Sequence, residues 1–305
     1  MILIIGCGGY IGSRLAAQLL DKGLPVRGFI LPHEYHACKN LIDRGLDCRI
    51  GDLTKTEDFR ELCKNVDCIY YLAGGHFRSI QRTKEVYIDG MRRLLDALQY
   101  EKADCFLYAS NGAVYGNLNG TFHREEEAVQ PNHPFGLVVR EAEQLLLQEA
   151  PVRPIILRIG EVYGSGKNNP FHYKTNHLTL LGNGQNYMSL IHEYDLLSLL
   201  VMAPNCLDSG IYNISDNLPV IQSEFYRQVE AICGHAFLEW VDQKEMPERI
   251  LFSIHGLRSL SIKMSNQKII KATHYKFRYP NYKVGLQRLW QDYVHNDQFG
   301  KEQNN

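Results

Sequence analysis

Three glycines close to the N-terminus, Gly6, Gly9 and Gly12, have the spacing that binds the phosphates of a dinucleotide. They directly follow the short apolar run 2–5 and precede a helical pattern over 11–22. The first glycine permits a tight turn, the second lets the backbone approach a pyrophosphate, and the third lets the helix pack close to the strand. The motif therefore predicts a phosphate cradle, with a ligand-free glycine-rich turn as the alternative.

The ligand that such a cradle predicts is a nicotinamide dinucleotide, NAD or NADP. The backbone N–H groups of Tyr10 and Ile11 open the expected helix, where its positive dipole end favours an anion. An NAD enzyme usually carries Asp or Glu at the end of the second strand, on the adenine ribose. The stretch 26–33 has no carboxylate there, which argues against strict use of NAD, and Arg27 and His33 do not stand where an NADP-binding side chain would. The sequence leaves the choice of cofactor open.

The elements that must position this cradle alternate between short apolar runs and longer helical patterns. This alternation predicts βαβ units, and so an α/β fold with a Rossmann-type, doubly wound parallel sheet. Strands are expected at 2–5, 26–31, 48–50, 68–72, 105–108 and 154–157, and helices over 11–22, 83–99 and 135–149. We expect a dinucleotide-binding domain at 1–164, with 189–216 returning to its sheet, a smaller C-terminal substrate lobe from 165–188 and 217–300, and a frayed tail at 301–305.

Composition limits the classes of partner. The chain has 305 residues and a formal net charge of -1, so no global basic field favours nucleic acid or an anionic membrane. No apolar run reaches the ~18 residues of a spanning helix, and the N-terminus lacks the pattern of a signal peptide. The eight cysteines have no zinc-site spacing, so we expect free thiols and no metal. These features predict a cytoplasmic protein with a small-molecule substrate.

Seven ordered segments resemble the extended short-chain dehydrogenase/reductase family, the NAD-dependent epimerases and dehydratases. The glycine motif is the first, and two later signposts fall at 191–196 and 212–214. In four segments between them, the resemblance implies contacts with the cofactor. These are the adenine-contacting turn at 51–53, the end of the fourth strand at 72–74, the catalytic strand end at 109–116 and the turn past the nicotinamide at 157–164. The residues concerned are Asp52, Leu53, Leu72, Ala73, Gly74, Ser110 and Ile159.

The match ends at the positions that carry the family's acid–base chemistry. The family's Ser or Thr aligns with Asn111, and its Tyr-x-x-x-Lys pair falls on Phe135 and Val139. Phenylalanine has no proton to donate, and valine cannot lower a phenol pKa or hold the nicotinamide ribose. The chain therefore resembles an atypical subgroup of the extended family, with the glycine motif intact and this pair missing.

Two other residues are candidates for the chemistry. Asn111 can polarise a carbonyl through its amide, with a turn-capping asparagine as the alternative. His133 can act as a general acid near neutral pH, with an exposed loop histidine as the alternative. The first hypothesis is therefore an oxidoreductase or epimerase-like enzyme on a small hydroxyl or carbonyl substrate. The second is a non-catalytic sensor or scaffold that binds the cofactor. Helix 135–149 is apolar on more than one face, which suggests a homodimer.

Overall fold

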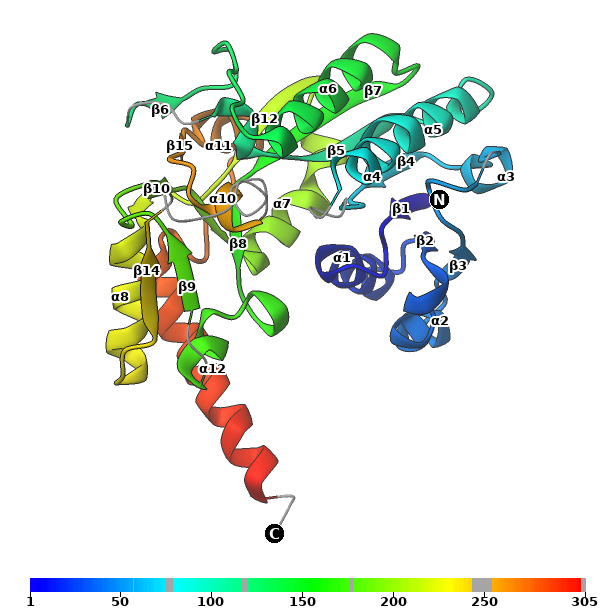
Figure 1. The fold of residues 1–305 in the computed structure, drawn as a ribbon. Helices are drawn as coiled ribbons and strands as arrows, with labels where there is room; N and C mark the ends of the chain where they lie inside the picture. Colours follow the sequence, from blue (N-terminus) through cyan, green and yellow to red (C-terminus); the bar gives the residue numbers. More distant parts are fainter. Residues whose placement is uncertain (57, 75–78, 117–119, 176–177, 243–253, 303–305) are drawn as a thin grey trace.

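The fold is built on a seven-stranded parallel sheet, which confirms the predicted α/β, Rossmann-type class (Figure 1). The computed structural model describes residues 1–56, 58–74, 79–116, 120–175, 178–242 and 254–302. The strand order is β12-β7-β5-β4-β1-β2-β3. The strands are β1 (Ile2–Ile5), β2 (Val26–Ile30), β3 (Asp47–Ile50), β4 (Cys68–Tyr71), β5 (Cys105–Asn111), β7 (Arg153–Ile159) and β12 (Gly210–Ile214).

Helices cover both faces of this sheet, so its central strands are apolar on both sides. One face packs against α1 (Tyr10–Asp21), α2 (Lys39–Asp43), α7 (Glu193–Cys206) and α11 (Gln267–Thr273). The other packs against α3 (Arg60–Cys63), α5 (Met91–Leu98) and α6 (Pro134–Glu149).

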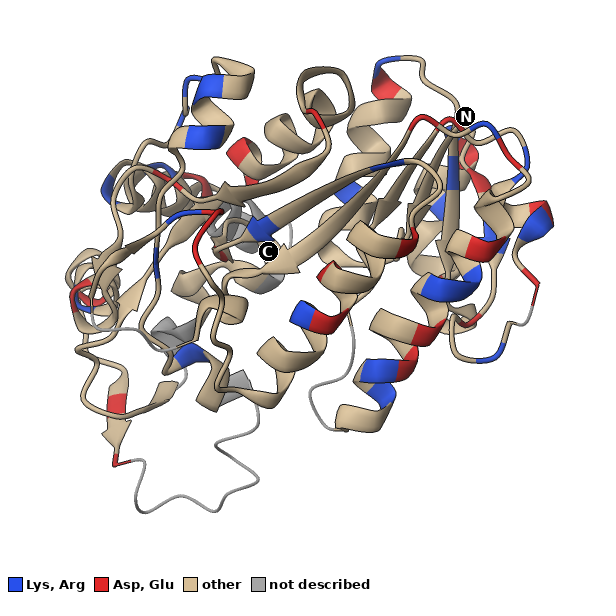
Figure 2. Ribbon diagram, turned by 90° about the horizontal axis from the view of Figure 1, so that it is seen from above, with Lys and Arg blue, Asp and Glu red and all other residues tan. Residues whose placement is uncertain are grey.

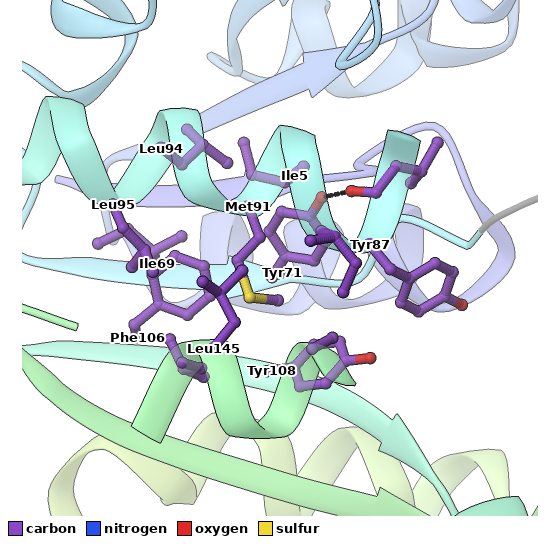
Figure 3. Close-up of a cluster of buried hydrophobic side chains, with 14 of the residues drawn as sticks. Ile5, Ile69, Tyr71, Tyr87, Met91, Leu94, Leu95, Phe106, Tyr108 and Leu145 are labelled. Atoms are coloured by element: carbon purple, nitrogen blue, oxygen red, sulfur yellow. Dashed lines mark hydrogen bonds between the residues drawn. The ribbon is translucent and has the colours of Figure 1, made fainter. Parts of the chain in front are cut away.

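The helix predicted over 83–99 is interrupted. It consists of α4 (Ile80–Lys84), a π-helical turn at Glu85–Gly90, and α5. The turn carries a carbonyl into the core, where the Tyr71 hydroxyl donates a hydrogen bond to the backbone oxygen of Val86 (Figure 3). A buried phenol needs such a partner, because leaving it unpaired costs free energy.

A third apolar cluster lies beyond the sheet. It is centred on Phe171, Phe225 and Leu286 and lies among short paired strands and two long helices. These elements are β9 (Leu178–Leu181) with β14 (Leu238–Val241), β10 (Tyr187–Met188) with β13 (Val220–Ile221), α8 (Gln222–Cys233) and α12 (Tyr282–Glu302). Close by are β8 (Glu161–Tyr163) with β11 (Leu190–His192), β6 (Phe122–His123) with β15 (Lys263–Met264), and α10 (Ile254–Arg258).

The two ends of segment 189–216 belong to different sheets. β12 joins the central sheet beside β7, whereas β11 pairs only with β8 in a separate two-stranded sheet. The boundaries of the predicted domain and lobe stay predictions. Of the tail predicted at 301–305, α12 continues to Glu302, and residues 303–305 lie outside the described residues.

Charged residues of both signs are interspersed over the helices and loops (Figure 2), and the formal net charge is -1. Among the described residues, no helix is both long enough and apolar enough to cross a membrane. The same part of the chain holds no group of three or more His, Cys, Asp or Glu side chains that could bind a metal ion.

Candidate functional site

The first and third glycines of the motif occupy positions that only glycine fits. Gly6 has a φ of +82°, and a Cβ added to it would lie 2.8 Å from the backbone nitrogen of Ala73 at the end of β4. A Cβ added to Gly12 would lie 2.2 Å from the carbonyl oxygen of Gly6. Both positions would clash with backbone that cannot move aside. Glycine at these two positions therefore lets the backbone of the loop pack closely without side chains.

The start of α1 is ready to accept an anion. Its N-cap is Gly9, which has no side chain to cap the helix, and the first turn carries no acidic residue. The N–H groups of Tyr10, Ile11 and Gly12 donate to no described residue. Such unsatisfied groups at a helix N-terminus suit a phosphate, because the helix dipole adds to the hydrogen bonds. The residues present therefore fit the pyrophosphate of a dinucleotide.

A cavity of about 190 Å³, the cofactor cavity, lies along the carboxyl ends of β1, β2 and β4. Parallel sheets bind dinucleotides at this edge. Seven residues predicted as cofactor contacts line it: Gly6, Gly9, Asp52, Leu53, Leu72, Ala73 and Gly74. Its remaining lining residues were not predicted as contacts: Phe29, Ile30, Leu31, Glu34, Gly51, Arg82 and Val86.

Glu34 corrects the expectation that the second strand ends without a carboxylate. A short 3-10 turn (Pro32–Glu34) follows β2, and it folds the Glu34 side chain back to the strand end. There Oε2 accepts a hydrogen bond of 2.9 Å from the backbone N–H of Leu31. A Cβ added to Gly8 would lie 2.5 Å from the Glu34 carboxyl carbon, so this carboxylate lies directly against the glycine loop. The carboxylate is in place, but three residues later in the chain than expected.

An ion pair lies beside the end of β3 at the cofactor cavity. Arg82, from α4, donates a 2.9 Å hydrogen bond to Asp52, and the Thr54 backbone N–H donates to the same carboxylate. Burial opposes the charged carboxylate, yet these hydrogen bonds hold the pKa of Asp52 below its ordinary value. Asp52 is thus an anion that fixes the turn after β3.

Asn111 lies at the carboxyl end of β5 and lines a second cavity of about 60 Å³, the reaction cavity. Its neighbour in register on β7 is Ile159, which lines the same cavity. The Oδ1 atom of Asn111 accepts a 2.8 Å hydrogen bond from the Ala113 N–H, so this asparagine does cap the turn that follows. Its Nδ2 donates to none of the described residues, so the amide remains available to a ligand.

Ser110, predicted to contact the cofactor, lies elsewhere. It is buried, lines neither of these two cavities, and donates a hydrogen bond to Glu143 of α6. Arg158 of β7 donates two hydrogen bonds to the same carboxylate, of 3.0 Å from Nε and 2.8 Å from Nη2. Burial opposes the charge on Arg158, but its bonds to Glu143 raise the pKa of the guanidinium. Ser110 and Arg158 are paired in register on β5 and β7, one step before the pair of Asn111 and Ile159.

His133 is buried, with 4% of its surface exposed, so the alternative of an exposed loop histidine is wrong. Its Nδ1 accepts a hydrogen bond from the Phe135 N–H and caps α6. His133 is not among the lining residues of the reaction cavity, and its role as a general acid stays a prediction. Phe135 and Val139 lie in the first two turns of α6, are 4% and 0% exposed, and belong to the core; the Phe135 ring packs edge-on against Tyr87.

A third cavity, of about 40 Å³, adjoins the reaction cavity. The two share Glu161, Met188 and Arg258, and the Nε of Arg258 lies 3.3 Å from the Oε1 of Glu161. Sequence reasoning missed this pair. β8 supplies the glutamate and α10 the arginine, and nothing in the local sequence of either indicates that they meet.

One further contact joins the cradle to the segment beyond the sheet. The Tyr10 hydroxyl, at the start of α1, donates to Glu193 at the start of α7. Glu193 also accepts a 2.7 Å hydrogen bond from the Ser165 N–H and pairs with Arg14 at 3.2 Å. The Glu193 carboxylate therefore binds both the start of α1, next to the phosphate cradle, and the loop after β8.

Comparison with known proteins identifies the family. An uncharacterized UDP-glucose epimerase of Bacillus subtilis is 30% identical over 212 residues, which cover 60% of this chain and 66% of that protein. A 3-beta-hydroxysteroid dehydrogenase of Mycolicibacterium neoaurum is 25% identical over 268 residues, which cover 76% of this chain and 70% of that protein. The chain thus spans about two thirds of the length of these curated relatives.

The fold also matches a solved structure. UDP-glucuronic acid 4-epimerase of Bacillus cereus, in complex with UDP-glucuronic acid and NAD, superposes with a TM-score of 0.79 at 22% identity, over 97% of this chain and 99% of that one. The model of the NAD dependent epimerase/dehydratase family matches residues 2–215. Since this match spans most of the chain, the protein is a member of the NAD dependent epimerase/dehydratase family.

Proposed function

We propose that this chain is an NAD-dependent oxidoreductase or epimerase-like enzyme that acts on a small hydroxyl or carbonyl substrate. The proposal rests on one arrangement: a fitted dinucleotide cradle and a separate cavity lie at the same edge of one sheet, with Asn111 in the second. The bound nicotinamide supplies the hydride chemistry, while the chain supplies position and a route for the proton. We further propose that Phe135 and Val139 replace the family's Tyr and Lys, so that the proton donor is non-standard.

Asn111 is the residue that we propose to hold the reacting oxygen. Its Oδ1 is engaged by the Ala113 N–H, which fixes the amide plane and leaves Nδ2 as the donor. A preorganised amide donor that stabilises a developing oxyanion is worth about 10²–10³ in kcat. Replacing this donor should therefore lower turnover while leaving the cofactor bound in its own cavity.

The test is cofactor binding followed by turnover. NADH is titrated by its fluorescence, and aldehydes and ketones are then screened for loss of its absorbance. Sugar nucleotides are incubated with NAD⁺ and analysed by chromatography for an epimerised product, because an epimerase consumes no net NADH. We expect Asn111→Ala to lose turnover and to bind NADH as the parent does. Asn40→Ala, at an exposed position on α2, is the matched control. Turnover that survives in Asn111→Ala would refute the role of this amide.

For the cofactor, we propose NAD in preference to NADP. The support is Glu34, whose carboxylate lies at the end of β2 against the glycine loop, where the adenine ribose is expected. A carboxylate there can accept hydrogen bonds from ribose hydroxyls, and it repels the 2′-phosphate of NADP. The ratio of the Kd for NADPH to the Kd for NADH should be at least about 10 in the parent chain. It should fall in Glu34→Gln and stay unchanged in Glu61→Gln, an exposed position on α3.

The alternative is a non-catalytic protein that senses the cofactor or holds a partner. Burial of Phe135 and Val139 in the core favours it, since neither position can then serve proton transfer. Tight NADH binding with no turnover on the whole panel would select this alternative. The two relatives leave the substrate open, since one is named for a UDP-sugar and the other for a hydroxysteroid.

For the assembly, we propose a homodimer that packs along α6. The helix buries one side in the core but leaves Leu137 and Leu147 exposed at 53% and 46%. Sedimentation that shows a monomer at micromolar concentration would refute it.

A further inference from the structure

Tyr187 contributes a phenol to the wall of the reaction cavity. It lies on β10 and lines this cavity together with Asn111. Its backbone is held from two sides, because β10 pairs with β13 at Ile221 and the Ile262 N–H donates a 2.9 Å hydrogen bond to the Tyr187 carbonyl oxygen. Its hydroxyl forms no hydrogen bond with the described residues. The residue is therefore fixed at the cavity wall, and its O–H group is available to a ligand.

Lys263 lies over the face of the same ring. Its Nζ atom is 3.6 Å from the centre of the Tyr187 ring, and it donates a 2.8 Å hydrogen bond to the carbonyl oxygen of Gly120. Lys263 belongs to β15, which pairs with β6. A cation in this position is attracted by the electrons of the ring. It attracts the negative charge that the ring gains on losing a proton more strongly still. The ammonium group can thus stabilise the phenolate that proton transfer leaves behind.

The other described groups that line the reaction cavity are weaker candidates for the proton donor. Ser189 also has a hydroxyl, but its Oγ accepts a 2.8 Å hydrogen bond from the Met264 N–H and donates to a backbone carbonyl oxygen. A glutamate is ordinarily ionised near neutral pH and then has no proton to give, and Glu161 pairs with Arg258 at 3.3 Å. Among the described lining residues, Tyr187 combines an unengaged O–H group with a cation beside it.

We propose that Tyr187 donates the proton to the reacting oxygen, and that Lys263 is a positioning residue that acts through Tyr187 by stabilising its phenolate. The pair takes the place of the family's Tyr and Lys from elements outside α6. In carbonyl reduction with NADH, the O–H bond of Tyr187 breaks and its proton forms a new O–H bond on the substrate oxygen as the carbonyl carbon gains the hydride. The phenolate then regains a proton from water. This inference rests on the proposed function for the reaction.

The first test is turnover of the aldehyde and ketone panel by the full chain with NADH. Tyr187→Phe should lower kcat by about 10²–10⁴ and leave the Kd for NADH unchanged. Lys263→Met should lower kcat by about tenfold with KM unchanged, and Lys263→Arg should recover most of this loss because it keeps a cation. Turnover that Tyr187→Phe leaves intact would overturn the proposal.

The second test needs neither turnover nor cofactor. Benzenesulfonyl fluoride reacts with a phenolate to form a sulfonate ester and release fluoride, and peptide mass spectrometry identifies the modified tyrosines. We expect Tyr187 to react about tenfold more slowly in Lys263→Met than in the parent, and at close to the parental rate in Lys263→Arg. Tyr100, which is 79% exposed, reports on the reagent itself. Equal rates at Tyr187 in the parent and Lys263→Met, or modification of Tyr100 without Tyr187, would overturn the proposal.

Lys268→Met is the matched control. It removes a lysine of α11 whose Nζ lies 4.6 Å from the centre of the Tyr212 ring, and neither residue lines the reaction cavity. It should leave kcat and the labelling of Tyr187 at their parental values. A parent without turnover on the whole panel would refute the proposed function and, with it, the donor role of Tyr187. Turnover that neither Tyr187→Phe nor Lys263→Met changes would refute this inference alone.

Discussion

The buried Glu143–Arg158 pair gives the sharpest prediction about the stability of the fold. Both side chains are 3% exposed, and two hydrogen bonds of 3.0 and 2.8 Å join them. Glu143→Gln keeps the shape of the side chain but leaves the charge of Arg158 buried without a counter-ion. Breaking such a pair from one side costs about 3–5 kcal/mol.

Glu143→Gln should lie at the lower end of that range, near ~3 kcal/mol, because the amide oxygen still accepts one hydrogen bond. This is a large share of the roughly 5–15 kcal/mol by which folded proteins are stable. The assay is urea unfolding followed by far-UV circular dichroism, which reports on the whole sheet. Tryptophan fluorescence is less suitable here, because Trp240 and Trp290 both pack on the third cluster.

Two variants make the result decisive. Glu141→Gln, exposed on the same helix, should change the free energy of unfolding by less than about 0.5 kcal/mol. The double variant Glu143→Leu/Arg158→Met should recover most of the loss, because an apolar pair of similar volume often replaces a buried ion pair without cost. If Glu143→Gln costs no more than Glu141→Gln, the reasoning about this network is wrong.

Three further predictions concern the glycine motif, the core beneath α6 and a buried carboxyl group. Gly12→Ala should lose NADH binding by more than about tenfold, since its Cβ would lie 2.2 Å from the oxygen of Gly6; unchanged fluorescence titration would contradict this. Val139→Lys should lower the melting temperature and yield no new turnover, because the position is 0% exposed and an unpaired ammonium there is costly. A stable Phe135→Tyr/Val139→Lys protein with new turnover would contradict this prediction. Burial, with the nearby Asp195, raises the pKa of Asp216 from 3.8 to about 8, so Asp216 binds its proton more tightly when folded and its contribution to stability falls as pH rises through that window. Across this window, the free energy of unfolding of Asp216→Asn minus that of the parent should therefore rise by up to about 1.4 kcal/mol per pH unit. Above the window this difference should stay constant, as measured by unfolding at a series of pH values.

The sequence was sufficient for features that depend on local sterics. Gly6 and Gly12 can be recognised from the sequence because each position excludes a side chain. Gly6 has a left-handed φ, Gly12 lies in close contact with backbone, and glycine is the residue type that satisfies both constraints. Most strands of the sheet are recognisable as short apolar runs between longer helical patterns, whereas β3, with Asp47 and Arg49, is not uniformly apolar. Seven residues of the cofactor cavity follow from these two facts and the family resemblance.

Features that depend on the three-dimensional path of the backbone, or on contacts between separate elements, were missed. Glu34 is three residues beyond the expected position, and only the 3-10 turn after Leu31 brings its carboxylate back. The pair of Glu161 with Arg258 joins residues that are far apart in the chain. The π-helical turn at Glu85–Gly90 was missed because its apolar spacing is indistinguishable from that of a continuous helix.

The position of Phe135 and Val139 decides how the two functional hypotheses should be weighed. Both side chains are buried in the cluster between the sheet and α6, so they stabilise the fold where the family resemblance implies an acid and a cation. A side chain that fills the core cannot also exchange a proton with a ligand. In the proposed enzyme, the chemistry falls to groups that line the reaction cavity, and among the described ones Asn111 has an amide donor held in place at the strand end. Turnover in the parent that is lost in Asn111→Ala would support an enzyme with a displaced reaction centre, whereas a parent that binds NADH without turnover would support a protein that only binds its cofactor.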